Sequence, residues 1–299
     1  MLSASAAAFD YSNPAVPVEE IISGGPEKDA IPALTDPETT GAAQADYLLP
    51  HDRILGVVVD GRARAYPVKI LNWHEAVNDE IEGKPLLITY CPLCGSGMVF
   101  DAYINSKRMY FGVSGLLYKS DALFYDLATD GLWSQLAMKA VTGPYSGTEL
   151  HHYPAEMTTW RSWTERYPET EVLSIETGYE REYLSDPYFI YSVTSEMHLP
   201  GLDQDKRLGF KDWVYGVVIN SESRAYPLSE LVKSRLPVQD RVGGTDLEIE
   251  YSRLEKTVRV SDQQGNPVPG VQCFWFAWSA FHPETSVYFR DENRNVRSG

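Results

Sequence analysis

The sequence lacks any apolar run long enough to cross a membrane as a helix. Nowhere in its 299 residues does a stretch approach the roughly eighteen consecutive apolar residues that a span requires. The N-terminal MLSASAAAFDYSNP also lacks the charged region and continuous apolar core of a secretory signal. We therefore expect a soluble chain with no membrane span. Its Ala/Ser-rich start fits a native terminus or the remnant of a removed export signal, so an extracytoplasmic location stays open.

Basic residues are scarce. The chain has 26 Lys and Arg against 42 Asp and Glu, a formal charge of −16. Binding to a nucleic acid backbone needs clustered basic side chains that displace counterions, so nucleic acid is excluded as an expected partner. The sequence also lacks a Gly-rich phosphate loop, an HExxH motif and a GxSxG motif. Nucleotide binding, zinc proteolysis and serine hydrolysis therefore have no support.

Cysteine is rare and localised. Of three cysteines, two stand in the motif Cys91-Pro-Leu-Cys94, which is too few for a disulfide framework. Cys273, inside the aromatic run VQCFWFAW, is typical of a small buried apolar residue. The pair in the motif requires a chemical explanation.

Aromatic residues are abundant, and they reveal the organisation. Nineteen Tyr, ten Phe and seven Trp are interleaved with Val, Thr and Ile, which favours strands over long helices. The segment GVVVDGRARAYPVKIL from Gly56 matches GVVINSESRAYPLSEL from Gly216, an offset of 160. After one inserted residue, ITYCPLCGSGMVFD from Ile88 aligns with IEYSRLEKTVRVSD from Ile249. Internal similarity of this kind predicts a repeated structural unit.

We therefore predict a β-rich α+β fold of two related sheet-based repeats, with short helices, packed as one globule. The expected parts are an extended N-terminal arm over residues 1–50, a first repeat over 51–195 and a degenerate second repeat over 209–290. A polar, Gly-containing linker near 195–210 joins the repeats. The first repeat carries a 46-residue insertion between Asp101 and Trp160, whose turn signals predict hairpins beside the cysteine motif.

The cysteine pair is private to the first repeat, because Ser252 and Glu255 stand at the aligned positions of the second. Two thiols at this spacing can form a disulfide or bind one metal, and both chemistries use thiolate. Three interpretations remain open: thiol redox chemistry with Cys91 attacking and Cys94 resolving, a zinc or copper site, and a structural role. A zinc ribbon needs two such knuckles and only one is present, so further ligands would come from elsewhere, such as His74, Met98, Cys273 or the pair His151 and His152.

Asn72-Trp73-His74-Glu75 is also private to the first repeat. A neutral His74 beside the cysteine strand could accept a thiol proton or bind metal, with Glu75 fixing its tautomer. The alternative is a histidine that is hydrogen-bonded at a turn. We take His74 with Cys91 and Cys94 as the candidate catalytic set and, on the other interpretation, as the metal ligands.

Residues of the insertion mix aromatic and polar groups in the manner of a small-molecule pocket. With three residues near the cysteine motif, they form the predicted pocket: Trp73, Glu75, Tyr90, Ser114, Tyr118, Ser120, Asp121, Trp133 and Gln135. Each residue singly is as typical of an ordinary hairpin.

The motifs ILNWHEAVND, TYCPLCGSGMVFD, FGVSGLLYKSDALFYD and TTWRSWTERYPETEVLS resemble a prokaryotic family catalogued as domain of unknown function 3179. The resemblance runs from about residue 17 to 290, and its motifs occur in order without visible departure. The family has no established activity, so the resemblance strengthens the site at Cys91 and Cys94 without naming a reaction.

Our leading functional hypothesis is a redox protein, of the thiol–disulfide oxidoreductase kind, that acts on a small molecule or a partner thiol. The alternative is a zinc or copper module without turnover that uses Cys91, Cys94 and His74. A third hypothesis is a noncatalytic binding domain.

Overall fold

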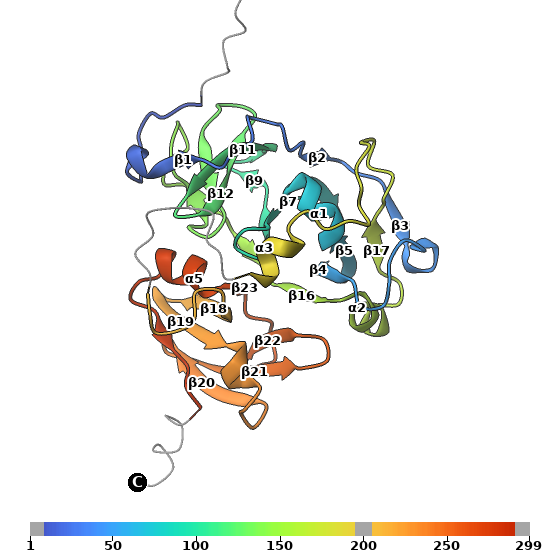
Figure 1. Ribbon diagram of the computed structural model, residues 1–299, viewed down its shortest axis with the longest axis vertical. Helices are drawn as coiled ribbons and strands as arrows, with labels where there is room; N and C mark the ends of the chain where they lie inside the picture. The colour runs from blue at the N-terminus through green and yellow to red at the C-terminus, as the bar shows by residue number, and fades with distance from the viewer. Residues whose placement is uncertain (1–8, 195–204, 291–299) are drawn as a thin grey trace, which may run out of the picture.

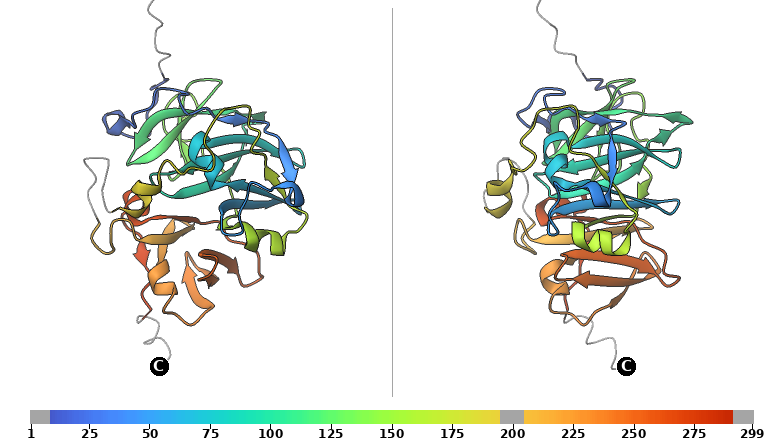
Figure 2. Two further views of the ribbon diagram at one scale, coloured as in Figure 1. Left: turned by 45° about the vertical axis from the view of Figure 1, so that its right-hand side comes forward. Right: turned by 90° about the vertical axis from the view of Figure 1, so that its right-hand side faces the viewer.

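The computed structural model describes residues 9–194 and 205–290. Strands make up 43% of the chain and helices 13%, so the predicted β-rich globule with short helices is confirmed. Residues 205–290 lie below residues 9–194 in the views of Figures 1 and 2. None of the helices in these described ranges is long and apolar enough to span a membrane.

The described strands form five larger sheets, which we call blades 1 to 5. In spatial order, blade 1 contains β16 (Ala155–Thr159), β4 (Arg53–Val59), β5 (Arg62–Pro67), β17 (Glu171–Leu173) and β3 (Thr39–Gly41). Blade 2 contains β15 (His152–Tyr153), β8 (Ser96–Asp101), β7 (Lys84–Cys91), β6 (Ala76–Ile81) and β2 (Leu34–Thr35). Blade 3 contains β1 (Ile21–Ser23), β11 (Phe111–Tyr118), β12 (Asp121–Asp126), β13 (Leu132–Ser134) and β14 (Lys139–Ala140).

The C-terminal part supplies the other two blades. Blade 4 contains β23 (Val271–Phe274), β18 (Trp213–Ile219), β19 (Glu222–Pro227) and β24 (Ser286–Val287), and blade 5 contains β20 (Val238–Val242), β21 (Thr245–Ser252) and β22 (Thr257–Asp262). A separate hairpin joins β9 (Tyr103–Ile104) to β10 (Lys107–Arg108). The helices are α1 (Val68–His74), α2 (Trp160–Arg166), α3 (Phe189–Val193), α4 (Leu228–Leu231) and α5 (Trp275–Phe281), with 3-10 turns η1 (Val18–Glu20) and η2 (Ala42–Gln44).

The blades form a five-bladed, propeller-like arrangement. Strand contacts link blade 3 to 2 through β11 and β6, blade 2 to 1 through β8 and β4, blade 1 to 5 through β16 and β22, and blade 5 to 4 through β20 and β19. The ring closes where Lys119 Nζ of blade 3 donates to Ala280 O of α5, 2.9 Å away. The prediction of two repeats as the architecture was therefore wrong.

The sequence similarity nevertheless marks matching elements within this arrangement. The hairpin β4–β5 pairs Gly56 with Ala65, and β18–β19 pairs Gly216 with Ala225. Tight turns follow from left-handed backbone at Asp60-Gly61 and at the corresponding Asn220 and Ser221, as two-residue hairpin loops require. The architecture departs from two units for two reasons. The insertion supplies β11 to β14, which make up most of an additional blade, and the strands β15 and β16 pair with blades whose other strands come much earlier in the sequence.

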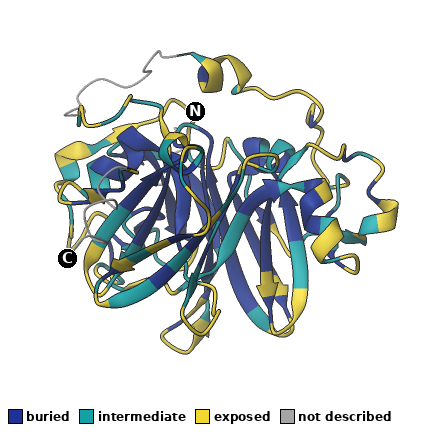
Figure 3. Ribbon diagram, turned by 90° about the horizontal axis from the view of Figure 1, so that it is seen from below, coloured by how far each residue is buried: buried dark blue, intermediate teal, exposed yellow. Residues whose placement is uncertain are grey.

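The N-terminal segment does not form a unit by itself. Its strands β1, β2 and β3 join blades 3, 2 and 1 respectively. The domain boundaries proposed from the sequence stay predictions, and residues 195–204 of the proposed linker lie outside the described residues. Buried residues follow the strands through the interior, whereas exposed residues gather in the loops (Figure 3). The largest buried apolar cluster draws on blades 2, 3 and 4 and contains all three cysteines.

A buried ion pair connects blades 1 and 2. Arg64 Nη1 lies 2.9 Å from Asp79 Oδ1, and Tyr66 donates to Asp79 Oδ2 at 2.7 Å. Arg224, Tyr226 and Asp240 make the same contacts between blades 4 and 5. The carboxylates of Asp79 and Asp240 therefore each link two neighbouring sheets.

Replacing Asp79 with Asn should lower the free energy of unfolding by roughly 3 kcal/mol, because the buried guanidinium of Arg64 then keeps only the partly exposed Glu171 as a carboxylate partner. The control is Asp60→Asn, which removes an exposed ion pair to Lys84 and should cost about 0.5 kcal/mol or less. Urea unfolding measures both. Equal losses in the two variants would contradict the role of Asp79.

Candidate functional site

The cysteine motif is the turn of a hairpin in blade 2. Strand β7 ends at Cys91, which pairs with Ser96 at the start of β8. Gly95 has a φ of +64°, and a Cβ there would lie 2.4 Å from the Trp213 ring, so only glycine fits both the turn and this contact. The turn is fixed from blade 4 by Phe274 N, which donates to Cys94 O at 2.9 Å.

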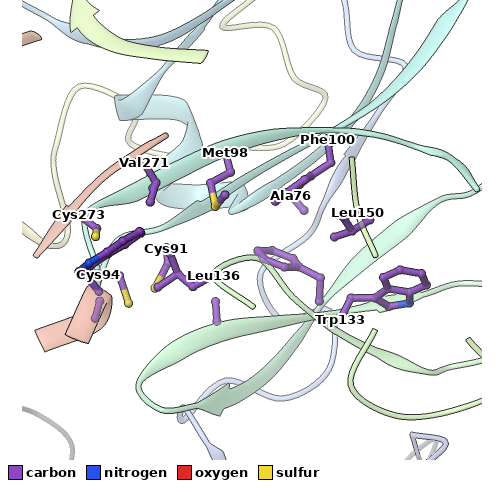
Figure 4. Close-up of a cluster of buried hydrophobic side chains, with 14 of the residues drawn as sticks. Ala76, Cys91, Cys94, Met98, Phe100, Trp133, Leu136, Leu150, Val271 and Cys273 are labelled. Atoms are coloured by element: carbon purple, nitrogen blue, oxygen red, sulfur yellow. The ribbon is translucent and has the colours of Figure 1, made fainter. Parts of the chain in front are cut away.

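Blade 3 brings a carboxylate to the two thiols. The ligand atoms of Cys91, Cys94 and Asp121 all lie within 4.8 Å of one another, and we call these three residues the acidic cluster. Their exposed fractions are 1%, 0% and 0%. Both thiols are free, and Cys94 Sγ donates to Ser120 O at 3.3 Å. Figure 4 shows Cys91 and Cys94 close together among apolar side chains.

Gln135 and Leu136 hold the Asp121 carboxylate. Gln135 Nε2 donates to Asp121 Oδ1 at 2.8 Å and to Ser96 Oγ at 2.9 Å, and Leu136 N donates to Asp121 Oδ2 at 3.2 Å. The Oε1 atom of Gln135 is buried and has no hydrogen-bond partner. An unpaired buried acceptor costs free energy, so this oxygen marks a place for a donor or a cation.

Burial sets the charge of the acidic cluster. It raises the pKa of Asp121 to about 6, although hydrogen bonds from Gln135 and Leu136 oppose the rise. Burial also raises the pKa of Cys91, and it raises that of Cys94 well above its usual range. Without a bound cation both thiols are protonated at neutral pH.

Glu75 adds a fourth buried acid nearby. It ends α1 in the left-handed conformation, with a φ of 55°, and its carbonyl accepts from Tyr90 N at 2.7 Å. Burial raises the pKa of Glu75 to about 8, and the negative charge of Asp121 adds to the rise. The Tyr188 hydroxyl donates to Glu75 Oε1 over a distance of 3.4 Å.

His74 does not belong to the acidic cluster. Its Nδ1 lies 2.7 Å from Pro32 O and its Nε2 2.6 Å from Tyr183 Oη. Nδ1–H therefore donates to the carbonyl and Nε2 accepts from the hydroxyl, which occupies both ring nitrogens. Burial lowers the pKa of His74 and keeps it neutral. The structure places this histidine in the hydrogen-bonded role that the sequence left as the alternative.

The predicted pocket residues divide into two groups. Ser120, Asp121, Gln135 and Glu75 gather around the cysteines as described above. The remaining five make their contacts elsewhere. Trp133 shares the apolar core of the cysteines but donates to Asp126, and Tyr90 lies in a core of blades 1 and 2. Ser114 donates to Leu123 O, Tyr118 packs on Phe281, and Trp73 lines a surface hollow with Tyr179.

The other ligands considered from the sequence lie outside the acidic cluster, although Cys273 is close enough to contribute to the raised pKa of Cys94. Met98 and Cys273 lie in the same apolar core, and His151 and His152 line a cavity beside it. Sequence reasoning missed Ser96, Tyr188 and Tyr191, whose hydroxyl donates to Leu93 O in the turn at 3.0 Å. The motif PYFIY contains both tyrosines, but nothing in its spacing ties them to the cysteines.

Fold and site together define a propeller-like β protein with a buried pair of thiols beside a carboxylate. A family model described as "Protein of unknown function (DUF3179)" matches residues 28–285. The chain belongs to this family, and the resemblance stated from its motifs is confirmed. No curated protein and no solved structure matches the chain.

Glu75 predicts a pH dependence of stability. Its folded-state pKa of about 8 lies above the ordinary value of 4.5, so the folded protein holds the proton more tightly and the wild type loses stability as pH rises between these values. Glu75→Gln removes this loss. In chelator, the variant should gain on the wild type by on the order of 3 kcal/mol between pH 5 and 8.5, as measured by urea unfolding.

Glu82→Gln is the control, since Glu82 has a similar φ of 51° but a half-exposed side chain. Its difference from the wild type should stay within about 0.5 kcal/mol over the same pH range. A pH-independent effect of Glu75→Gln would show that Glu75 does not titrate as described.

Proposed function

We propose that this chain binds a thiophilic divalent metal ion through Cys91, Cys94 and Asp121. The observation that carries the proposal is the convergence of three acidic groups, contributed by two blades, within 4.8 Å in the interior. Buried groups that compete for charge are stabilised by a cation, which reverses the effect of burial on their pKa values. The unpaired Gln135 Oε1 on the side chain beside Asp121 supports a missing positive partner.

The ligand types favour zinc over copper. Thiolates suit both zinc and cuprous ion, but of these two ions only zinc commonly takes a carboxylate ligand. Three protein ligands also leave one position of a tetrahedral zinc ion open to a further ligand. Of the sequence-based metal set, Cys91 and Cys94 are kept, and Asp121 replaces His74 because both nitrogens of His74 already have partners.

Purified protein, reduced and stripped of metal, should bind about one zinc ion in calorimetric titration. Cys91→Ser and Cys94→Ser should each weaken binding about 100-fold, and Asp121→Asn about tenfold. Because the thiols must lose protons, affinity should rise between pH 6 and 8.5. Cys273→Ala is the matched control, a buried cysteine in the same apolar core, and should bind as the wild type does.

A wild type that takes up no zinc would refute the metal site, and a Cys273→Ala variant as impaired as Cys91→Ser would refute the proposed ligand set of Cys91, Cys94 and Asp121. Circular dichroism of every variant separates loss of ligand from loss of fold.

Thiol redox chemistry is the second candidate, and the proximity of the two sulfur atoms favours it. Oxidation would join Cys91 Sγ to Cys94 Sγ, with two electrons and two protons passing to a small disulfide that is reduced to two thiols. The redox function ranks second to metal binding because reactive cysteines are partly exposed and have a low pKa, whereas these two thiols are buried and their pKa values are raised. Access for a protein thiol is poor, since both side chains are buried.

On the redox hypothesis, oxidised glutathione should convert the motif to a disulfide that dithiothreitol reverses. Thiol titration in denaturant should then fall from three thiols to one, and to none in Cys273→Ala. Persistence of all three thiols after prolonged exposure would exclude this candidate while leaving the zinc titration unaffected.

A further inference from the structure

A cavity of about 580 Å³ lies where blades 2, 3 and 4 meet. Gly216 and Val271 of blade 4, Met98 of blade 2 and Leu136 beside blade 3 contribute to its wall, with Trp278 of α5. Its volume falls in the range of small-molecule sites. The exposed residues Glu149 and His151 also line it, so the cavity opens to solvent there.

A second cavity occupies the corresponding place between blades 1 and 5, and its volume is about 350 Å³. Gly56 and Trp163 line it, as Gly216 and Trp278 line the first. In both places the indole lies so close that a Cβ on the glycine would meet it within 2.5 Å. Each indole Nε1 donates to a threonine seven residues later, Thr170 or Thr285.

One pair of aligned wall positions differs in charge between the two cavities. Glu156 lies opposite Gly56 in the smaller cavity, and Val271 lies opposite Gly216 in the larger one. Arg259 aligns with Met98, each on the last strand of its hairpin. Glu156 and Arg259 form an ion pair at 2.7 Å, so an ion pair in one cavity is replaced by valine and methionine in the other.

This exchange makes the larger cavity a place for an apolar occupant. Val271, Met98, Leu136 and Trp278 present aliphatic, thioether and indole surface, on which a flat aromatic molecule packs well. A charged occupant would lose its hydration without a partner among these groups. This part of the wall therefore favours an uncharged ring system, whereas the polar residues that line the cavity elsewhere are Glu149, His151, His152 and His282.

His152 is a residue that can make a polar contact with an occupant of the cavity. It lines the cavity, and its Nε2 is buried without a hydrogen-bond partner. Burial lowers the pKa of His152 to about 4, so the ring is neutral and one of its nitrogens is an acceptor. With the proton on Nδ1, Nε2 is a buried acceptor without a donor, which costs free energy that a ligand hydroxyl would recover.

We propose that the cavity binds a small uncharged aromatic molecule that carries a hydroxyl donor, a compound of the phenol class, with its ring against Trp278 and Met98 and its hydroxyl on His152. The site is distinct from the acidic cluster, and the proposal stands without a metal ion at that cluster. Leu136 and Met98 pack in the same core as the cysteines, so the ligand lies next to that cluster.

The test titrates the full chain with 2-naphthol and with 2-methoxynaphthalene, which has the same rings but no donor. The wild type should bind 2-naphthol about fivefold more tightly, the value of one hydrogen bond. His152→Phe should bind both probes equally. Met98→Arg combined with Val271→Glu recreates the ion pair of the smaller cavity and should abolish binding of both, and Leu150→Trp, which fills the cavity from another wall, should do the same.

Zinc stoichiometry of His152→Phe is measured in parallel and should equal that of the wild type. If the wild type binds neither probe, or if binding persists in both filled variants, the proposal is wrong. Equal affinity for the two probes in the wild type overturns the role of His152. Because the zinc measurement is separate, failure of this proposal and failure of the metal site give different results.

Discussion

Cys91, Cys94, Asp121 and Glu75 cannot all be ionised in one buried space. Each charge removed from water costs free energy, and like charges at short range raise one another's pKa values. The region where blades 2, 3 and 4 meet must therefore hold either protons or a cation. This constraint links the chemistry of the site to the stability of the fold, because groups from different blades share the charge.

The propeller-like arrangement explains why the turn of a hairpin becomes a site. In blade 2 the turn that contains Cys94 accepts a hydrogen bond from Phe274 N of blade 4 and lies against Asp121 of blade 3. The matching turn in blade 5 meets blade 1, where Glu255 O accepts from Arg53 Nη1. Both turns join neighbouring blades, but the acids at the first turn are buried, whereas Glu255 at the second forms an ion pair with Arg259.

The sequence could predict the strands, the hairpin turns and the residues nearest the thiols, because those signals are local. Alternation and left-handed turn residues such as Asp60 specify β4–β5, and the absence of cysteine from the matching hairpin pointed to the candidate site. It could not predict the ring of blades, which depends on pairs such as Glu171 with Arg64, more than a hundred residues apart. His74 was misleading for the same reason: its partners, Pro32 and Tyr183, are distant in the sequence.

Leu136 connects the acidic cluster to the neighbouring cavity. Its backbone N–H donates to Asp121 Oδ2, whereas its side chain lines the cavity. A residue in a close-packed interior cannot move its side chain far without moving its backbone. Any occupant that displaces Leu136 therefore changes a hydrogen bond that stabilises the Asp121 carboxylate. On the two proposals, charge at the cluster and occupancy of the cavity would be coupled through Leu136, and such a coupling would act equally in both directions.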